Sequence, residues 1–175
     1  YKYNLLDRNL LAFNAEVPLF AQWDDHEVTN DWCPGQSLDW GGYVDKSILK
    51  LVARGCRAFH EFMPMRETLA EAGRIYRKIA YGPLLDVFLI DMRSYRTAHG
   101  ADGAAAAILG ATQLAWLKRE LMRSQATWKV IAADLPIGVV SADAIAQGDG
   151  APRGREIEIA DLLAFIKHAG IRNTV

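Results

Sequence analysis

The feature that most constrains the fold is a repeated order of short apolar run, helical pattern and short apolar run. The runs at 84–91 and 128–135 are rich in Val, Ile and Leu, and each has the length of a typical strand. Between them, Leu114, Leu117 and Leu121 recur at helical spacing. Strands that alternate with helices favour an α/β layered fold.

Turn residues and helix signals divide the rest of the chain into further expected elements. Residues 75–81 and 85–91 predict two strands, and Gly82-Pro83 between them predicts an antiparallel hairpin. A buried strand is expected at 17–23, and the start of another strand at 173–175. A helix is expected from about Asp45 to before Pro64. Loops are expected at 28–44, 100–110 and 137–155. Thr112 is expected to cap the start of the middle helix. A last helix is expected to end at Gly170 and to have four residues on its core face, Ile159, Leu162, Leu163 and Ile166.

Length, charge and cysteine content exclude several classes of protein. The 175 residues suit a single domain with a sizeable core. The net charge of -1 gives no sign of broad binding to nucleic acid or to an anionic membrane surface. The longest apolar run, 84–90, is interrupted by Asp86 and is too short to cross a bilayer. Cys33 and Cys56 provide neither a disulfide framework nor a C-x-x-C metal motif.

The strongest chemical signal is the acidic run Asp24-Asp25-His26-Glu27, directly after the apolar residues 17–23. Ligand sites in open α/β sheets lie at the carboxyl ends of strands. Adjacent carboxylates repel each other, and a hard cation relieves that repulsion. A neighbouring His can bind the metal or transfer a proton near neutral pH. The same four letters are also compatible with a solvated acidic loop that contains a capping Asp.

A further candidate for metal binding stands near an expected strand end. Asp134 lies near the end of the run at 128–135, where it offers either a hard-metal ligand or a loop cap. Asn30 follows the acidic run, where Asn commonly caps or bends a loop. We expect Asp25, His26 and Asp134 to converge on one edge of the sheet.

A charged cluster of one acid and two arginines follows the expected strand at 85–91. Its members are Asp91, Arg93 and Arg96. A guanidinium can bind a phosphate with two parallel hydrogen bonds. The alternative is a structural Asp–Arg network at the strand end.

Several motifs, in matching order along the chain, resemble those of the alkaline phosphatase D (PhoD-like) family of calcineurin-like metallophosphatases. The resemblance lies in FNAEVPLFAQWDDHEVTNDW at 13–32, LLDVFLIDMRSYR at 84–96, LGATQLAWLKRELMRSQATWKVIAADLP at 109–136 and GREIEIADLLAFIKHAGIRNTV at 154–175. Together with shorter matches at 76–82, these stretches extend over nearly the whole chain.

This resemblance implies a metal-dependent phosphoesterase that acts on phosphate monoesters or diesters through a metal-activated hydroxide. It implies that Asp25 and Asn30 bind metal and that Asp134 takes a third metal-site position, where the family often has His or Asn. His26 would contact the phosphate and assist the leaving group. Implied cofactors are metals such as iron and calcium, and the implied substrate is a phosphate-ester small molecule or a phospholipid. Export to the periplasm or the cell exterior is also implied. Residues expected to support the site or contact the phosphate are Asp24, Asp91, Arg93 and Arg96.

The same resemblance implies a partial domain. Residues 1–175 would form part of a four-layer α/β/β/α sandwich, incomplete at both ends, because two metal-ligand segments of the family would precede Tyr1 and follow Val175. We therefore expect the 175-residue chain alone to be inactive, to bind metal weakly or not at all, and to self-associate through exposed sheet edges. Two alternatives stay open, a phospholipase D-like phosphodiesterase and a non-catalytic binding module. Metal content distinguishes the binding module from the enzymes.

Overall fold

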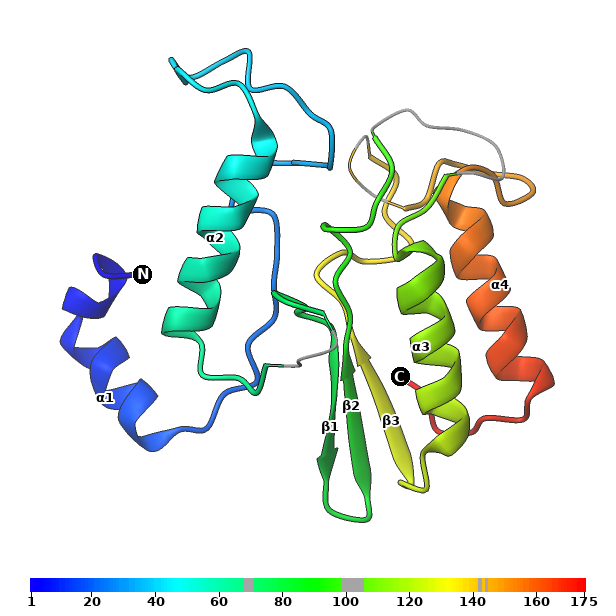
Figure 1. The fold of residues 1–175 in the computed structure, drawn as a ribbon. Coiled ribbons are helices and arrows are strands. Elements are labelled where there is room, and N and C mark those ends of the chain that lie inside the picture. The colour runs from blue at the N-terminus through cyan, green and yellow to red at the C-terminus, as the bar shows by residue number, and fades with distance from the viewer. Residues whose placement is uncertain (68–70, 99–105, 142, 144) are drawn as a thin grey trace.

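The computed structural model describes residues 1–67, 71–98, 106–141, 143 and 145–175. Its elements, in chain order, are η1 (Asn4–Leu6), α1 (Arg8–Glu16), α2 (Ile48–Phe62), β1 (Arg77–Tyr81), β2 (Leu85–Leu89), α3 (Gly110–Arg123), β3 (Trp128–Ala132) and α4 (Arg155–His168). Figure 1 shows them as a central sheet with α3 and α4 on one side and α1 and α2 on the other. The mixture of helices with a sheet confirms the predicted α/β class. Most of the loop predicted at 100–110 lies outside the described residues.

The sheet has three strands in the order β1-β2-β3. Strands β1 and β2 form the predicted antiparallel hairpin, and Gly82 takes the positive φ of 66° that its turn requires. Strands β2 and β3 are parallel and are joined by α3, so that Leu89 pairs with Ala132. The predicted strand start at 173–175 is also confirmed, because Thr174 forms a parallel bridge with Lys129 on the far side of β3.

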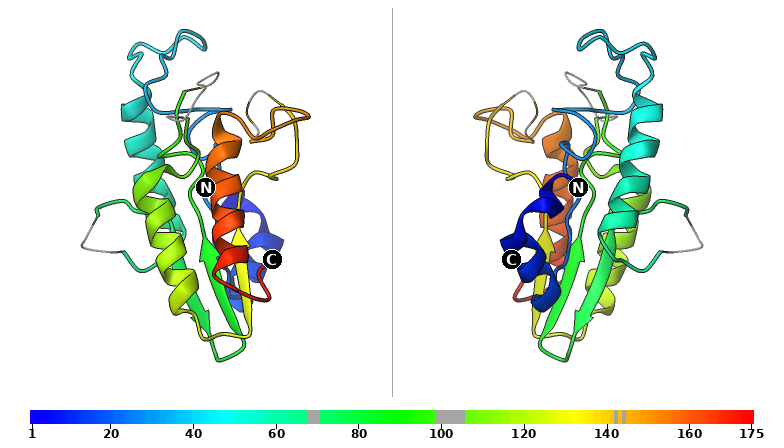
Figure 2. Two further views of the ribbon diagram at one scale, coloured as in Figure 1. Left: turned by 90° about the vertical axis from the view of Figure 1, so that its right-hand side faces the viewer. Right: turned by 90° about the vertical axis from the view of Figure 1, so that its left-hand side faces the viewer.

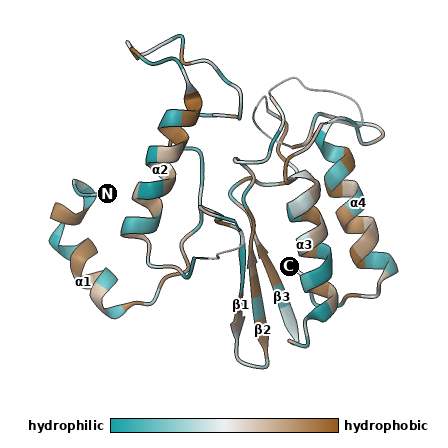
Figure 3. Cartoon of the chain, in the orientation of Figure 1, coloured by the Kyte–Doolittle hydropathy of each residue, from teal (hydrophilic) through white to brown (hydrophobic). Residues whose placement is uncertain are grey.

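Helices α3 and α4 lie side by side and cover one face of the sheet (Figure 1, Figure 2). The residues buried between them and the strands form one apolar cluster, called here the sheet core. Its fully buried members include Phe88 from β2 and Leu117 from α3. The cluster consists of Tyr76, Phe88, Ile90, Met92, Ile108, Leu109, Trp116, Leu117, Leu121, Ile145, Ile159 and Leu162. Figure 3 accordingly colours much of the three strands as hydrophobic.

A second apolar cluster, called here the α2 core, lies between α2 and the loop that precedes it. It consists of Trp23, Trp32, Leu38, Ile48, Phe59 and Ile75. The ring of Trp23 packs edge-on against Phe59 at 5.4 Å and against Trp32 at 6.2 Å between ring centroids. Offset and edge-on aromatic contacts of this kind are favourable beyond the apolar area they bury. The α2 core thereby fixes the acidic run, which begins directly after Trp23.

The segment at 17–23 is not the strand that the sequence predicts. It has no regular secondary structure, and side chains rather than a backbone ladder connect it to the sheet. The Arg77 guanidinium donates to the Ala21 carbonyl at 2.8 Å, and Gln22 Nε2 donates to the Ile90 carbonyl at 2.5 Å. Tertiary contacts that a local pattern cannot reveal therefore decide its conformation.

Two helix starts also differ from expectation. Helix α1 was not expected, since none of its residues is buried and it has no strong apolar periodicity. Its one clear signal is Asp7, whose carboxylate accepts from the backbone N–H groups of Asn9 and Leu10. Helix α3 begins before Thr112, which does not cap it. The Glu158 carboxylate of α4 accepts instead from the N–H groups of the residues just before α3, Ile108 and Leu109.

Helix α4 follows the predicted boundaries but differs in one face residue. Ile159 and Leu162 are buried as expected, whereas Leu163 is half exposed and points away from the sheet core. The helix ends before Gly170, which has the predicted stop conformation with φ of 65°. Among the described helices, none combines the length with the apolar composition that a membrane span requires.

Candidate metal centre

The candidate site lies at the carboxyl ends of the parallel strands β2 and β3. Because paired parallel strands end at the same edge of a sheet, the residues that follow them become neighbours. Arg93 follows β2 by four positions, and Asp134 follows β3 by two. The acidic run reaches the same edge from the α2 core.

Four carboxylates surround the guanidinium of Arg93, which is 1% exposed. Its Nε lies 2.8 Å from Asp134 Oδ2, and its Nη1 lies 2.8 Å from Asp143 Oδ2. Its Nη2 lies 3.2 Å from Asp24 Oδ1, and Asp25 Oδ2 is 4.0 Å from Nη1. The structure thus brings together Asp24, Asp25 and Asp134 from the sequence prediction. Arg96 adds a second positive charge through its ion pair with Asp143, so the four acids outnumber the two arginines at this site.

The carboxyl group of Asp134 has a raised pKa at this site. Burial raises its pKa to about 7, even though Arg93 lies beside it and favours the charged form. Asp24 adds to the rise, because a nearby negative charge disfavours ionisation. The Oδ1 atom of Asp134 is buried and has no hydrogen-bond partner among the described residues. A buried carboxylate oxygen without a partner is the kind of atom that a metal ion would satisfy.

Asp25 is held by the loop that it starts. Its backbone carbonyl accepts from the N–H groups of Val28 and Thr29 at 2.8 and 2.9 Å. Its carboxylate Oδ2 accepts from the N–H of Asp31 at 2.6 Å. Asp31 has a positive φ of 53°, a conformation in which Asp is enriched. Only 5% of Asp25 is exposed, so its carboxylate is already positioned at the site.

His26 lies at the outer side of the cluster and is exposed. Its Nε2 atom lies 3.0 Å from Asn30 Oδ1 and 3.7 Å from Asp25 Oδ1. The hydrogen bond with Asn30 raises the pKa of the imidazole, and the negative charge of Asp25 adds to the rise. The other end of the Asn30 amide donates to Asp31 Oδ2 at 2.8 Å. Asn30, to which the family resemblance assigns a place in the metal site, contacts His26 and Asp31 in this structure.

Two groups of residues have ligand atoms close enough to share one ion. They are Asp24, Asp25 and His26, and Asp25, Asp31 and Asp143. Within each group the ligand atoms all lie within 4.8 Å of one another. The second group is composed entirely of carboxylates, which suits a hard cation. Asp25 is the member that both groups share.

Asp31 and Asp143 were not predicted as site residues. Asp31 belongs to the same acidic stretch as Asp25, so its spacing offered a weak signal. Asp143 lies in the segment that the sequence predicts only as a loop. Arg96 holds it there, through Asp143 Oδ1 at 2.7 Å from Nη1 and through its carbonyl at 2.8 Å from Nη2. Only the folded chain brings this carboxylate to the site.

Asp91 has a structural place beside the cluster rather than in it. It is 1% exposed, and its Oδ1 accepts from the N–H groups of Arg93 and Ser94, both at 2.9 Å. Burial raises the pKa of this carboxyl. The Gln113 amide of α3 pairs with both backbone groups of Asp91, at 2.8 and 2.7 Å. These bonds fix the turn that points Arg93 towards the acids. Arg93 and Arg96 make ion pairs with other acids of the cluster, whereas the Asp91 carboxylate accepts from backbone N–H groups.

A family model, a protein sequence and a solved structure all match this chain, and all three carry the name PhoD or alkaline phosphatase D. The family model described as PhoD-like phosphatase matches residues 1–175. Alkaline phosphatase D of Bacillus subtilis (strain 168) is 30% identical over 190 residues, which cover 97% of this chain and 32% of that protein. A solved structure described as "Structure of PhoD" superposes with a TM-score of 0.74 at 26% identity, covering 96% of this chain and 35% of that one. The chain thus spans about a third of the length of these relatives.

Proposed function

Because this chain belongs to the PhoD-like phosphatase family, we propose that the protein is a metal-dependent phosphoesterase with its metal centre around Asp25. One observation carries the proposal at the level of residues. The carboxylates of Asp25, Asp31 and Asp143 have ligand atoms within 4.8 Å of one another. The buried, unpartnered Oδ1 of Asp134 stands at the same site, across Arg93.

The proposed ligands follow from the geometry. Asp25 is the shared ligand, because it belongs to both groups of closely spaced donors. Asp31 and Asp143 complete one group, and Asp134 contributes its free oxygen. Iron and calcium are the proposed metals, and calcium in particular suits oxygen-rich sites. When bound, such ions activate water and neutralise charge on the phosphoryl oxygens.

His26 is the proposed general acid. Hydrogen bonding to Asn30 raises the pKa of His26, so that the imidazolium persists closer to neutral pH than in a free His. In the protonated ring, Nε2–H donates to Asn30 Oδ1 and leaves Nδ1–H available. The exposed position of His26 lets Nδ1–H meet the leaving oxygen of a phosphate ester and transfer its proton to it. Asn30 is then a positioning residue, because it orients the ring.

The proposed substrates are phosphate esters, either small molecules or phospholipids. We extend the proposal to export from the cytoplasm, which rests on the family resemblance alone. Localisation of the epitope-tagged protein in cell fractions tests the export, independently of its chemistry.

Metal analysis combined with turnover tests the main proposal. We expect the full protein to hold near-stoichiometric metal and to hydrolyse p-nitrophenyl phosphate or bis(p-nitrophenyl) phosphate. Treatment with a chelator should abolish turnover, and added iron, calcium or manganese should restore it. A full protein that holds no metal and stays inactive after each addition would instead indicate a non-catalytic binding module.

A further inference from the structure

A large groove runs along the outer edge of the sheet, and the residues that line it are not among those of the candidate metal centre. Within the described sheet β1 pairs only with β2, so its other edge is open. The groove follows this edge between the segment at 64–67 and helix α3, and has a volume of about 1170 Å³. Pockets for small molecules typically have about 300–1,000 Å³. The space therefore suits an extended ligand.

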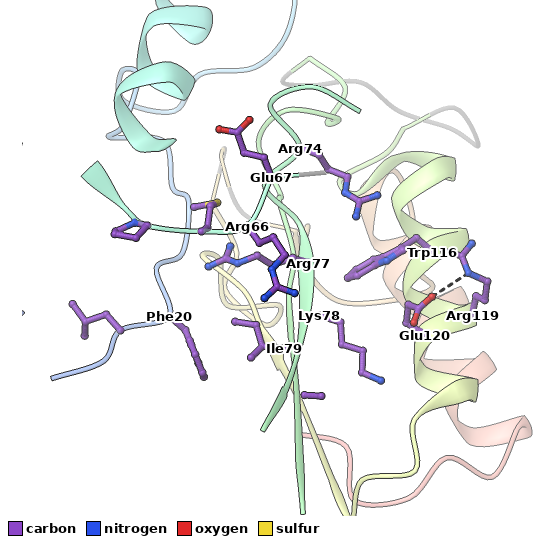
Figure 4. Close-up of a pocket in the computed structure, with 14 residues that line it drawn as sticks. Phe20, Arg66, Glu67, Arg74, Arg77, Lys78, Ile79, Trp116, Arg119 and Glu120 are labelled. Carbon is purple, nitrogen blue, oxygen red and sulfur yellow. Dashed lines mark hydrogen bonds and ion pairs between the residues drawn. The ribbon is translucent and has the colours of Figure 1, made fainter. Parts of the chain in front are cut away.

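The charges that line this groove are strongly unequal. Five cationic side chains line it, and they are Arg66, Arg74, Arg77, Lys78 and Arg119. Its acidic side chains are Glu67 and Glu120. The local charge of +3 contrasts with a net charge of -1 for the whole chain. Figure 4 shows Arg77 and Lys78 on β1, Arg119 on the facing side of α3, and Arg66 and Arg74 on the segments that precede β1.

Two of the five cations already have acidic partners. Lys78 lies 2.8 Å from Asp86 Oδ2, on the α3 face of the sheet. Arg119 lies 3.1 Å from Glu120 Oε1, as the dashed line in Figure 4 marks. These pairs reduce the charge that the two side chains offer to a ligand. The remaining positive charge belongs to Arg66, Arg74 and Arg77.

Arg77 is partly buried without a negative partner among the described residues. Its guanidinium donates only to neutral carbonyls, those of Ile75 at 3.2 Å and Ala21 at 2.8 Å. Burial lowers its pKa, which means that its surroundings disfavour the positive charge. An anion in the groove would stabilise the charged form.

Arg74 and Arg66 are similarly without carboxylate partners in the described part of the chain. The guanidinium carbon of Arg74 lies 4.8 Å from the ring centroid of Tyr76, which orients it at the groove. Its Nε is buried and has no hydrogen-bond partner among the described residues. A buried N–H of a cation is costly to leave unpaired. Arg66 is exposed and completes the charged side of the groove.

We propose that the groove along the outer edge of β1 binds an anion that carries several phosphate groups, with Arg66, Arg74 and Arg77 as its main contacts. The planar fork of a guanidinium matches the oxygens of a phosphate group. Three such forks distributed along an extended groove favour a ligand with several phosphates over a single orthophosphate. The groove shares no lining residue with the candidate metal centre, and the proposal does not depend on the proposed phosphoesterase activity.

Calorimetric titration with inorganic tripolyphosphate tests the groove. A chelator and low salt keep the metal centre empty and the electrostatic attraction unscreened. We expect saturable binding to the wild-type protein, and binding at least about tenfold weaker in the double variant Arg66→Gln/Arg74→Gln, since hydrogen bonds to charged groups are the strong ones. The matched control is Arg57→Gln, an exposed arginine of α2 outside the groove. Absence of saturable binding to the wild type, or equal weakening in the control, overturns the proposal.

A second variant separates loss of charge from damage to the fold. Glu120→Gln removes an acid from the groove and frees Arg119 from its ion pair. We expect tripolyphosphate to bind more tightly to this variant, by about twofold or more, because the neutralising charge is gone. The wild-type protein should also bind tripolyphosphate more tightly than orthophosphate. Unchanged or weaker binding to Glu120→Gln, or equal affinity for the two anions, contradicts the groove as the binding site.

Discussion

Arg93 and Asp134 meet 2.8 Å apart, although 41 positions separate them in the sequence. Each follows one of two adjacent parallel strands, and the pairing of Leu89 with Ala132 makes the two strand ends level. Helix α3 provides the connection that allows this parallel pairing. The positive charge around which the acids gather is therefore placed by the topology of the sheet.

Replacement of Arg93 by Met should destabilise the metal-free protein. Four carboxylates would lose their common cation, and breaking a buried ion pair typically costs about 3–5 kcal/mol. Urea denaturation at neutral pH measures the loss. Arg57→Met is the control, because this exposed side chain should change stability by less than about 0.5 kcal/mol. Millimolar calcium should recover part of the loss in Arg93→Met, as a second cation enters the cluster. Equal losses in both variants would contradict the central place of Arg93.

Asp25 and His26 should separate metal binding from proton transfer in the full protein. Asp25→Asn removes the shared carboxylate ligand, so metal content and turnover should fall together. His26→Gln should retain metal yet slow turnover by about 10²–10⁴-fold, the typical contribution of general acid catalysis. Metal analysis and steady-state kinetics on the same samples check both. If His26→Gln loses its metal as well, His26 is a ligand rather than the acid.

Gly55 of α2 should resist replacement by Ala. Helix propensity alone favours Ala by about 1 kcal/mol. An added Cβ would however lie 2.7 Å from the Glu27 carbonyl oxygen and 3.1 Å from Val28 Cγ2. Crowding of this kind typically costs about 1–3 kcal/mol, so thermal denaturation should show lower stability. Metal titration should also show weaker binding, because the loop of Asp25 is displaced.

The control for this helix is Ala53→Gly on the exposed side of α2. It should show the ordinary propensity loss of about 1 kcal/mol without any effect on metal binding. A more stable Gly55→Ala protein would show that α2 and the acidic loop are not in close contact.

Asp86 should make stability depend on acidic pH. Hydrogen bonds from Lys78 and Ser124 lower its pKa despite burial. A lowered pKa in the folded state means that the contribution is present above the unfolded pKa, about 3.9, and is lost as pH falls through the folded pKa. Asp86→Asn should therefore lose about 1.5–3 kcal/mol at pH 7. The gap from the wild type should shrink below about pH 4.

Denaturant titrations from pH 7 to pH 2.5 measure this gap. Asp161→Asn is the control, since its partner Lys118 pairs with it at the exposed surface. That variant should lose less than about 1 kcal/mol at any pH. A gap between Asp86→Asn and wild type that stays constant across the range would show that Asp86 is not stabilised as a carboxylate.

The sheet and most helices were predictable because their signals are local. Gly82 marks the hairpin turn, and the apolar runs around it give both strands. The conformation of 17–23 was not predictable, because Arg77 and Gln22 decide it through contacts with distant backbone. Helix α1 was missed for a related reason, since a helix without buried residues has no apolar stripe to detect.

The site shows the same division between local and distant information. Asp24, Asp25 and Asp134 could be singled out because they follow apolar runs in the sequence. Asp143 could not, because its place at the site depends on contacts with Arg93 and Arg96, which are far from it in the sequence. The cluster of four acids around Arg93 likewise forms only when the chain is folded.

The separation of the sheet core from the α2 core has a consequence for how the protein melts. Asp24 and Asp25 continue from Trp23 in the α2 core, whereas Arg93 follows Met92 in the sheet core. The ion pairs of Arg93 therefore join two otherwise distinct apolar clusters. A cation bound between them would stabilise only the state in which both clusters are folded. Calorimetry should then show one cooperative transition with metal, and two partly resolved transitions when a chelator or the loss of Arg93 uncouples the clusters.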